Sequence, residues 1–320
     1  MREKILLIGK RPLPIGGVTI HVDRLVTILE KLEMPFSFYN LKFFSVISLT
    51  NAILKHKYAH LHSSSSIFRL FFSLMCICTH TKSIITIHGN LGRFSFVYNL
   101  MDYMAVWLSD YPIVINQNSY LKAFKINKKT LLMSAYIPSM SNEKLSNNIV
   151  GMIEKMKSRY EFICISNAYN FSLGKDGEEI YGITELVTFF REENEYGFVL
   201  SDPSGEYSKR FIDVPDNIFI INKPHPFVEV LKYVDCYIRY TSTDGDSLSI
   251  HEAIDSGSFV IATDVVDRPT EVILVHRGDF IELKKKLHFL STAVQKDKTD
   301  ISRDLNTVDI VKFYNKCVFK

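Results

Sequence analysis

The chain has 320 residues, of which 47% are hydrophobic and 23% are charged, and its formal net charge is +3. This composition excludes disordered and collagen-like chains. The length suits two domains of roughly 150 residues each, so we expect a folded protein with two cores.

The first residues run directly into an apolar segment, without a long hydrophobic stretch or a small-residue cleavage site. We therefore expect no secretory signal and a cytoplasmic location. The most hydrophobic stretch, residues 67–78, contains Arg69 and is shorter than the roughly 20 residues that cross a bilayer. The five cysteines lack metal-ligand spacing, which favours reduced thiols (Cys76, Cys78, Cys164, Cys236 and Cys317).

Short predicted strands alternate with helical patterns in the first part of the chain. Residues 4–9 form an apolar strand, and Gly16 and Gly17 lie in the loop before an apolar helical pattern. Further strands are predicted at residues 58–62, 83–87, 113–115 and 130–133, and His88 follows the second of these. This alternation favours a parallel, doubly wound sheet.

A second set of such elements follows a polar stretch at residues 139–148, the best linker candidate in the chain. A helix with an apolar face is predicted at residues 184–191. The predicted strands are residues 161–165, 197–200, 217–221, 236–239 and 258–262. Two Rossmann-like halves would bind ligands at the carboxyl ends of these strands.

Charge is unevenly distributed along the chain. Residues 1–150 hold 17 Lys and Arg against 7 Asp and Glu, a net charge of +10, whereas the remainder holds 21 against 28, a net charge of −7. No acidic residue occurs between residues 34 and 101, where cations alternate with aromatic residues (Lys55, Lys57, Arg69, Lys82, Arg93, Phe43, Phe44, Phe68, Phe71, Phe72, Phe94 and Phe96). Such a surface suits anionic lipid or a phosphorylated acceptor. The alternative is that the aromatic rings are buried and the charges merely solvated.

The segment from Arg239 to Asp264 carries the densest pattern of polar residues. It is predicted to run from a strand end through a polar loop into a helix that begins near Asp246 or Ser247, either of which can cap it. The helix N-terminus then suits an anion such as a diphosphate. Asp244 precedes this helix and Glu252 lies about a turn and a half inside it, so two carboxylates can face one cleft.

This segment resembles the E-x7-E region of family 4 retaining glycosyltransferases, with Asp244 in place of the first Glu and Glu252 as the second. It is most similar to the bacterial surface-polysaccharide branch, whose R-x-T-x-x-D-G-D-S-x-S-x-x-E-A pattern matches nine residues here (Arg239, Thr241, Asp244, Gly245, Asp246, Ser247, Ser249, Glu252 and Ala253). The pairs Gly16-Gly17, His88-Gly89 and Arg268-Pro269 strengthen the resemblance.

The resemblance implies an α/β protein of the GT-B fold, with two Rossmann-like domains that face a central cleft. Residues 1–140 would be the acceptor-side domain, and residues 141–300 the domain that binds the nucleotide sugar. Residues 301–320 would form a helix that packs back on the first domain.

The resemblance also implies roles for individual residues on the donor side. Glu252 would bind the ribose hydroxyls and Asp244 the hydroxyls of the donor sugar. The diphosphate would be held by the segment that starts at Asp246 and by the amides around the helix start (Ser247, Leu248 and Ser249). Gly16 and Gly17 would let the first loop approach the phosphates, and His88 would face the donor sugar.

One departure from the family concerns the cation that neutralises the leaving diphosphate. The first strand of the second domain is not followed by the usual Arg and Lys. Arg239 is the favoured replacement and Lys175 or Lys223 the less favoured ones, because a leaving dianion needs a positive partner.

The implied activity is transfer of a hexose or N-acetylhexosamine unit from a UDP- or GDP-sugar to a saccharide hydroxyl. The transfer would retain the anomeric configuration and would need no metal or other cofactor. It would serve O-antigen or capsule assembly. The acceptor would be a glycan linked to a lipid diphosphate at the inner face of the plasma membrane, and no nucleic acid would be bound.

Several alternatives stay open at this point. The chain could be a degenerate homologue that binds a nucleotide sugar or glycan without turnover. Asp244-Gly-Asp246 could be the D-x-D metal motif of GT-A enzymes, which would require Mg²⁺ or Mn²⁺. A Rossmann epimerase or dehydrogenase is disfavoured, because Gly9 is not followed by G-x-x-G and no helical Y-x3-K pair occurs.

Several of these residues could also have an ordinary structural role. The glycine pair could simply form a turn, and His88 could be an ordinary loop histidine. Three other histidines have no assigned function, because single histidines at strand or helix ends are usually structural (His21, His62 and His225).

Overall fold

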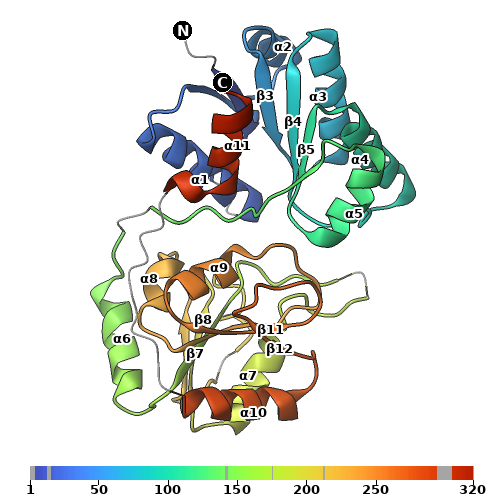
Figure 1. Cartoon of the computed structure of the whole chain (residues 1–320). Coiled ribbons are helices and arrows are strands. Elements are labelled where there is room, and N and C mark those ends of the chain that lie inside the picture. The colour runs from blue at the N-terminus through green and yellow to red at the C-terminus, as the bar shows by residue number, and fades with distance from the viewer. Residues whose placement is uncertain are drawn as a thin grey trace. The chain divides into compact units, whose positions relative to one another are not determined.

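The computed structural model describes residues 4–12, 16–140, 143–174, 176–211, 213–293 and 305–319. The chain divides into two compact units: unit 1 is Met1–Met140 with Arg303–Lys320, and unit 2 is Ser141–Ser302. Each unit contains one six-stranded parallel sheet with helices packed around it (Figure 1). Of the described helices, none combines the length and the apolar character needed to cross a membrane.

The sheet of unit 1 has the strand order β2-β1-β3-β4-β5-β6, with every pair parallel. Its strands are β1 (Ile5–Gly9), β2 (Phe36–Asn40), β3 (Tyr58–His62), β4 (Lys82–Ile87), β5 (Tyr111–Val114) and β6 (Leu131–Leu132). The helices between them are α1 (Gly17–Lys31), α2 (Val46–Leu54), α3 (Ser66–Cys78), α4 (Phe96–Leu108) and α5 (Gln117–Ile126), with a 3-10 turn at Leu41–Phe43.

Strand β1 shows why this sheet has a core on each face. All five of its residues are buried, as expected for a strand covered on both sides. Leu6 and Ile8 point into the core that includes Leu49 of α2, whereas Ile5 and Leu7 point into the core under α1. The alternation of side chains along a strand divides one apolar run between two layers.

Helix α11 (Asp309–Cys317) belongs to unit 1, although it follows unit 2 in the chain. It lies beside α1 in Figure 1. Ile310 and Val311 share a core cluster with Ile5 and Leu7. The Tyr314 hydroxyl is hydrogen bonded to Nδ1 of His60 at 2.5 Å, so the last helix also contacts a central strand.

The sheet of unit 2 has the order β12-β11-β10-β7-β8-β9 and is also wholly parallel. Its strands are β7 (Ile163–Asn167), β8 (Gly197–Ser201), β9 (Ile218–Ile221), β10 (Cys236–Arg239), β11 (Phe259–Thr263) and β12 (Ile273–Val275). Its helices are α6 (Asn147–Lys157), α7 (Ile183–Glu192), α8 (Phe227–Leu231), α9 (Leu248–Asp255) and α10 (Phe280–Ser291), and a 3-10 turn at Leu305–Thr307 precedes α11 in unit 1.

Arg69 does not belong to the basic surface on which the sequence analysis placed it. Its side chain is 3% exposed and donates to Asp102 at 2.7 and 3.0 Å, and to the carbonyl of Ser63 at 2.5 Å. The prediction was wrong because Asp102 lies just beyond the acid-free stretch and neutralises this charge between α3 and α4.

Candidate functional site

The strand order of unit 2 indicates a ligand-binding position at the carboxyl ends of β7 and β10. The chain fills the sheet from β7 through β8 to β9 in one direction, and then from β10 through β11 to β12 in the other. The order therefore reverses between β7 and β10. Ligands of doubly wound sheets bind at the carboxyl ends of the strands at such a point. The polar loop after Arg239 begins there, as does Asn167 at the end of β7.

A buried ionic group occupies this edge. Arg239 donates to both oxygens of Asp244, each at 3.0 Å, and Nη1 of Arg268 donates to the same carboxylate at 2.8 Å. The backbone N–H of Gly245 also donates to it at 3.0 Å. The side chains are 13%, 8% and 2% exposed for Arg239, Asp244 and Arg268. The structure thus joins two predicted site residues and adds a third, Arg268.

The ionic group carries a net charge of +1, because two guanidinium groups face one carboxylate. Burial by itself raises the pKa of Asp244, but the charge and hydrogen bonds of Arg239, and then those of Arg268, outweigh it and lower that pKa. Among the residues that the structure describes, none accepts a hydrogen bond from the buried Nη2 atom of Arg268. The group therefore retains a positive charge and an unused donor, which suits an anion.

Helix α9 begins at Leu248, directly after this group, and its N-cap is Ser247 and not Asp246. The Ser247 hydroxyl makes no capping hydrogen bond. Asp246 instead contacts Nε2 of His251 at 2.6 Å. The first N–H groups of a helix have no partner within the helix, and its N-terminus favours negative charge. The helix start is therefore a second feature that suits an anion here.

Asn167 at the end of β7 is hydrogen bonded to both β10 and α9. The Tyr237 hydroxyl donates to Oδ1 of Asn167 at 2.7 Å, and Nδ2 of Asn167 donates to the Ser249 hydroxyl at 3.0 Å. Asn167 was not singled out from the sequence, where it is an ordinary residue after an apolar strand. Glu252 lies on the same helix and is only 6% exposed.

The predicted glycine pair lies in unit 1, at the start of α1. Gly16 is the N-cap residue and has φ −172°, an extended conformation that any residue adopts. A Cβ atom added at Gly17 would meet nothing within 4 Å in the described part of the chain. The backbone therefore does not require glycine at Gly16, and space does not require it at Gly17.

His88 follows β4 and is brought together with two histidines that had no assigned function. One ring nitrogen from each of His21, His62 and His88 lies within 4.8 Å of the other two. Nδ1 of His62 and Nε2 of His88 are 3.0 Å apart. Burial, followed by the neighbouring histidines, lowers the pKa of His62 and of His88, and for His88 the nearby Arg69 contributes as well. The rings of His62 and His88 are therefore neutral at physiological pH.

The other candidate cations lie elsewhere or are not described. Lys175 lies outside the described residues. Lys223 is exposed in the loop after β9, where its carbonyl accepts a hydrogen bond from Nδ1 of His225 at 2.7 Å. Nε2 of His225 in turn contacts the hydroxyl of Ser201 at 2.9 Å.

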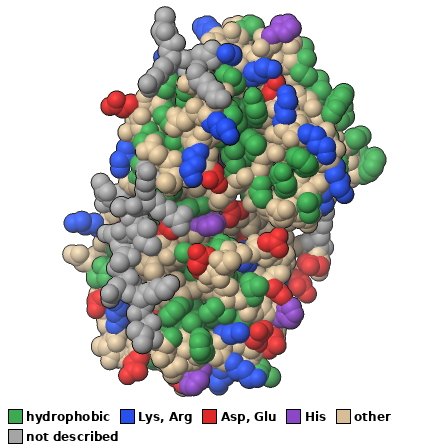
Figure 2. Space-filling view, viewed as in Figure 1, with side chains coloured by type: hydrophobic (Ala, Val, Ile, Leu, Met, Phe, Trp, Pro, Cys, Tyr) green, Lys and Arg blue, Asp and Glu red, His purple; other side chains and the backbone are tan. Residues whose placement is uncertain are grey.

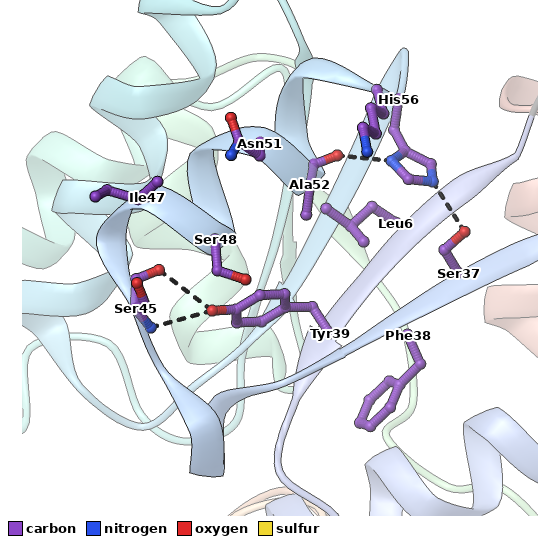
Figure 3. A pocket seen from close by; sticks show the side chains of 11 residues that line it. Leu6, Ser37, Phe38, Tyr39, Ser45, Ile47, Ser48, Asn51, Ala52 and His56 are labelled. Carbon is purple, nitrogen blue, oxygen red and sulfur yellow. Dashed lines mark hydrogen bonds between the residues drawn. The ribbon is translucent and has the colours of Figure 1, made fainter.

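A hollow of about 650 Å³ lies between β2 and α2 of unit 1, and Figure 3 shows its lining. Its polar groups bind one another: the Tyr39 hydroxyl bonds to the backbone of Ser45, and His56 bonds to the carbonyl of Ala52 and to Ser37. None of the predicted site residues is among those that line it. The hollow is therefore not the candidate site.

Comparison with solved structures identifies the fold. The chain matches HepE from Anabaena, in complex with UDP-glucose, at a TM-score of 0.65 and 12% identity over 89% of both chains. It matches the lipopolysaccharide outer core galactosyltransferase WaaB at a TM-score of 0.63 and 12% identity over 98% of both chains. The protein has the GT-B fold, as predicted.

The same arrangement also occurs in an enzyme of another class. The UDP-GlcNAc 2-epimerase from Methanocaldococcus jannaschii matches at a TM-score of 0.54 and 12% identity over 98% of this chain and 99% of that one. No protein-family model and no curated protein sequence matches the chain. The fold is therefore established by shape, and the function has to be argued from the site.

Proposed function

We propose that this protein is a glycosyltransferase that takes a sugar from a nucleotide-sugar donor. The observation that carries the proposal is the buried group of Arg239, Asp244 and Arg268, with its net positive charge and its unused Nη2 donor. It lies where the strand order of unit 2 reverses and where α9 begins. The solved neighbour HepE, which shares the fold, is in complex with UDP-glucose.

The two arginines supply the charge that glycosyl transfer needs. As the glycosidic bond breaks, negative charge develops on the departing diphosphate. Fixed donors in a water-poor site stabilise such charge strongly, and removal of one donor typically slows an enzyme about 100- to 1000-fold. Asp244 holds both arginines in place. This arrangement supports transfer without a metal at the diphosphate, with the amides around Ser247, Leu248 and Ser249 as further contacts.

The remaining donor roles are proposed from the sequence resemblance together with these positions. Glu252, which is nearly buried on α9, would bind the ribose hydroxyls of the nucleotide. Gly17 leaves open space at the start of α1 for a phosphate or sugar. In this scheme the chain acts as a family 4 enzyme of the surface-polysaccharide branch. The departing phosphate accepts the proton of the acceptor hydroxyl, and the anomeric configuration is retained.

One observation favours the alternative of a homologue that binds a donor without turnover. The Asp244 carboxylate already accepts four hydrogen bonds, from Arg239, Arg268 and the Gly245 amide. An ionised carboxylate has about four acceptor positions. A sugar hydroxyl would therefore have to displace one of these donors to reach Asp244.

Product analysis with a panel of UDP- and GDP-sugars tests the proposal. We expect release of free nucleotide, and formation of a new glycoside when a saccharide acceptor is present. Glu252→Ala should reduce transfer, whereas Glu154→Ala, at an exposed position on α6, should not. Donor binding without turnover would establish the binding homologue instead. Conversion of the donor to an epimer would place the chain with the epimerases.

A lipid-linked acceptor at the inner face of the plasma membrane is supported by the surface of unit 1. Helix α4 presents apolar residues to solvent at a spacing of three and four residues: Val97, Leu100, Met104 and Trp107. The adjacent α3 does the same with Ile67, Leu74 and Ile77. Two outward apolar stripes on neighbouring helices are unusual for a surface that faces only water.

Charge complementarity indicates an anionic membrane as the occupant of this surface. Figure 2 shows hydrophobic and basic side chains intermixed over the part of unit 1 that carries α3, α4 and α5. The exposed cations in and around these helices include Arg93, Lys122, Lys125, Lys128 and Lys129. Apolar side chains that enter the lipid boundary, flanked by Lys and Arg, are typical of proteins that lie on a membrane. We therefore propose peripheral attachment that brings the chain to an acceptor of the O-antigen or capsule type.

Liposome flotation tests this attachment. The protein should float with vesicles that contain anionic lipid and less so with neutral ones. The double variant Leu100→Ser/Trp107→Ser should reduce binding. Its matched control is Ile281→Ser/Phe289→Ser, which changes two apolar residues on α10 of unit 2 that are at least as exposed. Equal distribution with both kinds of vesicle, or equal loss in both variants, would remove the membrane proposal.

A further inference from the structure

The three histidines of unit 1 form a group that glycosyl transfer by the arginine pair does not require. His21 comes from α1, His62 ends β3 and His88 follows β4. The strand order of unit 1 also reverses, between β1 and β3, so this group lies at the ligand-binding edge of its own sheet. Residues far apart in the sequence thus place three imidazole rings at one point.

We propose that His21, His62 and His88 bind a single transition-metal ion of the Zn²⁺ class. One ring nitrogen of each lies within 4.8 Å of the others. Two nitrogens on one tetrahedral zinc are about 3.3 Å apart, since each lies about 2.0–2.1 Å from the metal. The 3.0 Å separation of the His62 and His88 nitrogens is close to this value. Only small side-chain shifts would close the group around an ion.

A hydrogen bond to the backbone already orients one of these rings. Nδ1 of His21 donates to the carbonyl of Ala135 at 2.7 Å, which leaves the lone pair on Nε2. Metal-binding histidines nearly always hold the second ring nitrogen in this way. His60 packs against His62 with ring centroids 4.1 Å apart, and it is itself held by Tyr314 and Thr86. The group is therefore built on fixed neighbours.

His62 supplies an independent indication of a missing ligand. Its side chain is buried, yet across the described ranges of the chain no hydrogen-bond partner lies at its Nε2 atom. A buried polar atom without a partner costs about 1–3 kcal/mol. An ion bound at Nε2 of His62 would remove that cost, whereas one bound at Nδ1 would not.

The chemistry of the ligands indicates the class of ion. Three neutral imidazoles suit Zn²⁺, Co²⁺, Ni²⁺ or Cu²⁺, whereas Mg²⁺ and Ca²⁺ require oxygen ligands. Three protein ligands leave a fourth position open. Because the group itself contains no carboxylate, the bound ion keeps its full charge and favours an anionic oxygen at that position. The resemblance implies that His88 contacts the donor sugar directly. In this proposal His88 would instead bind the ion, and the ion would contact an anionic oxygen at its fourth position.

Metal binding by tag-free protein tests the proposal without any nucleotide sugar. Protein stripped with EDTA should bind one equivalent of Co²⁺ with the visible absorption of a tetrahedral site, and Zn²⁺ should displace it. His62→Gln should weaken binding about 100-fold or more. His56→Gln is the matched control, because His56 also bonds a carbonyl through Nδ1 in unit 1 but lies outside the group. That variant should bind Co²⁺ like the wild type.

The absence of a tetrahedral Co²⁺ spectrum, or equal binding by the two variants, would overturn the proposal. If His62→Gln does not fold, His88→Gln replaces it, because the His88 side chain is only half-buried. Because the readout is metal binding alone, failure here leaves the glycosyltransferase proposal standing. Conversely, a chain without transferase activity can still bind the ion.

Discussion

The two sheets of this protein share one architecture but carry opposite kinds of side chains at corresponding edges. In unit 1 the edge beside the reversal of strand order holds histidines (His21, His62 and His88). In unit 2 the corresponding edge holds charged groups (Arg239, Asp244 and Arg268). A parallel sheet thus supplies a location for chemistry, and the residues after each strand decide what that chemistry is.

The charged edge should contribute most to stability through Asp244. Asp244→Asn leaves two buried guanidinium groups without their counterion, so we expect a loss of about 3–5 kcal/mol in the free energy of unfolding. Denaturant titration measures this loss. Asp216→Asn, at a side chain that is 89% exposed, is the control and should change little. A loss below about 1 kcal/mol would show that the ionic group is not a coupled unit.

The same edge should dominate catalysis through Arg268. Arg268→Met removes one positive charge beside the proposed diphosphate, and we expect transfer to slow about 100- to 1000-fold. The measurement is kcat/KM for the donor. Arg277→Met is the matched control, because Arg277 is a half-buried arginine of unit 2 that pairs with Glu185 and not with Asp244. Equal losses in both variants would point to folding and not to charge.

The two edges should respond to acid at different pH values. Burial, and then the charge of His21, lowers the pKa of His60 well below 6.5. The unfolded chain therefore binds more protons at His60 than the folded chain does. The free energy of unfolding should fall as the pH drops below about 6.5. The pKa of Asp244 is lowered too, so its contribution is present above about 3.9 and is lost only as the pH falls through the folded value. Unfolding of EDTA-treated wild type, His60→Gln and Asp244→Asn across this range separates the two steps. An unchanged profile in His60→Gln would contradict the first step.

The smallest effect is expected at the glycine pair of unit 1. Gly17→Ala adds a methyl group where nothing described lies within 4 Å, so stability should change by less than about 0.5 kcal/mol. If the loop approaches the donor, transfer should still fall about tenfold. Gly182→Ala in unit 2 is the contrast, because Gly182 has φ +58° and its Cβ would lie 2.4 Å from the carbonyl of Tyr240. Gly182→Ala should therefore destabilise the fold. Unchanged transfer in Gly17→Ala would contradict the proposal that the loop before α1 approaches the phosphates.

Most of the fold could be predicted from the sequence, because buried parallel strands are short continuous apolar runs. The predictions for residues 58–62 and 236–239 coincide with β3 and β10. Strand β2 was missed because Phe36–Asn40 alternates with polar residues and is only half-buried at a sheet edge. Strand β12 was missed because three residues at the other sheet's edge give too short a pattern.

The candidate site was less accessible to prediction, because its members meet only in three dimensions. Arg239 and Asp244 were both found, since they share one loop, but their ion pair was not foreseen. Arg268 comes from beyond β11, and no local spacing links it to Asp244. His21 and His62 likewise come from separate elements, so each alone resembled an ordinary structural histidine.

The return of α11 to unit 1 has a consequence for synthesis of the chain on the ribosome. The core around Ile5 and Leu7 is completed by Ile310 and Val311, which are made only after the whole of unit 2. Domains usually mature in the order of translation. Here unit 1 has to wait for α11, while unit 2 can finish beforehand. A stop codon placed just before Asp309 would therefore damage the unit that is encoded first.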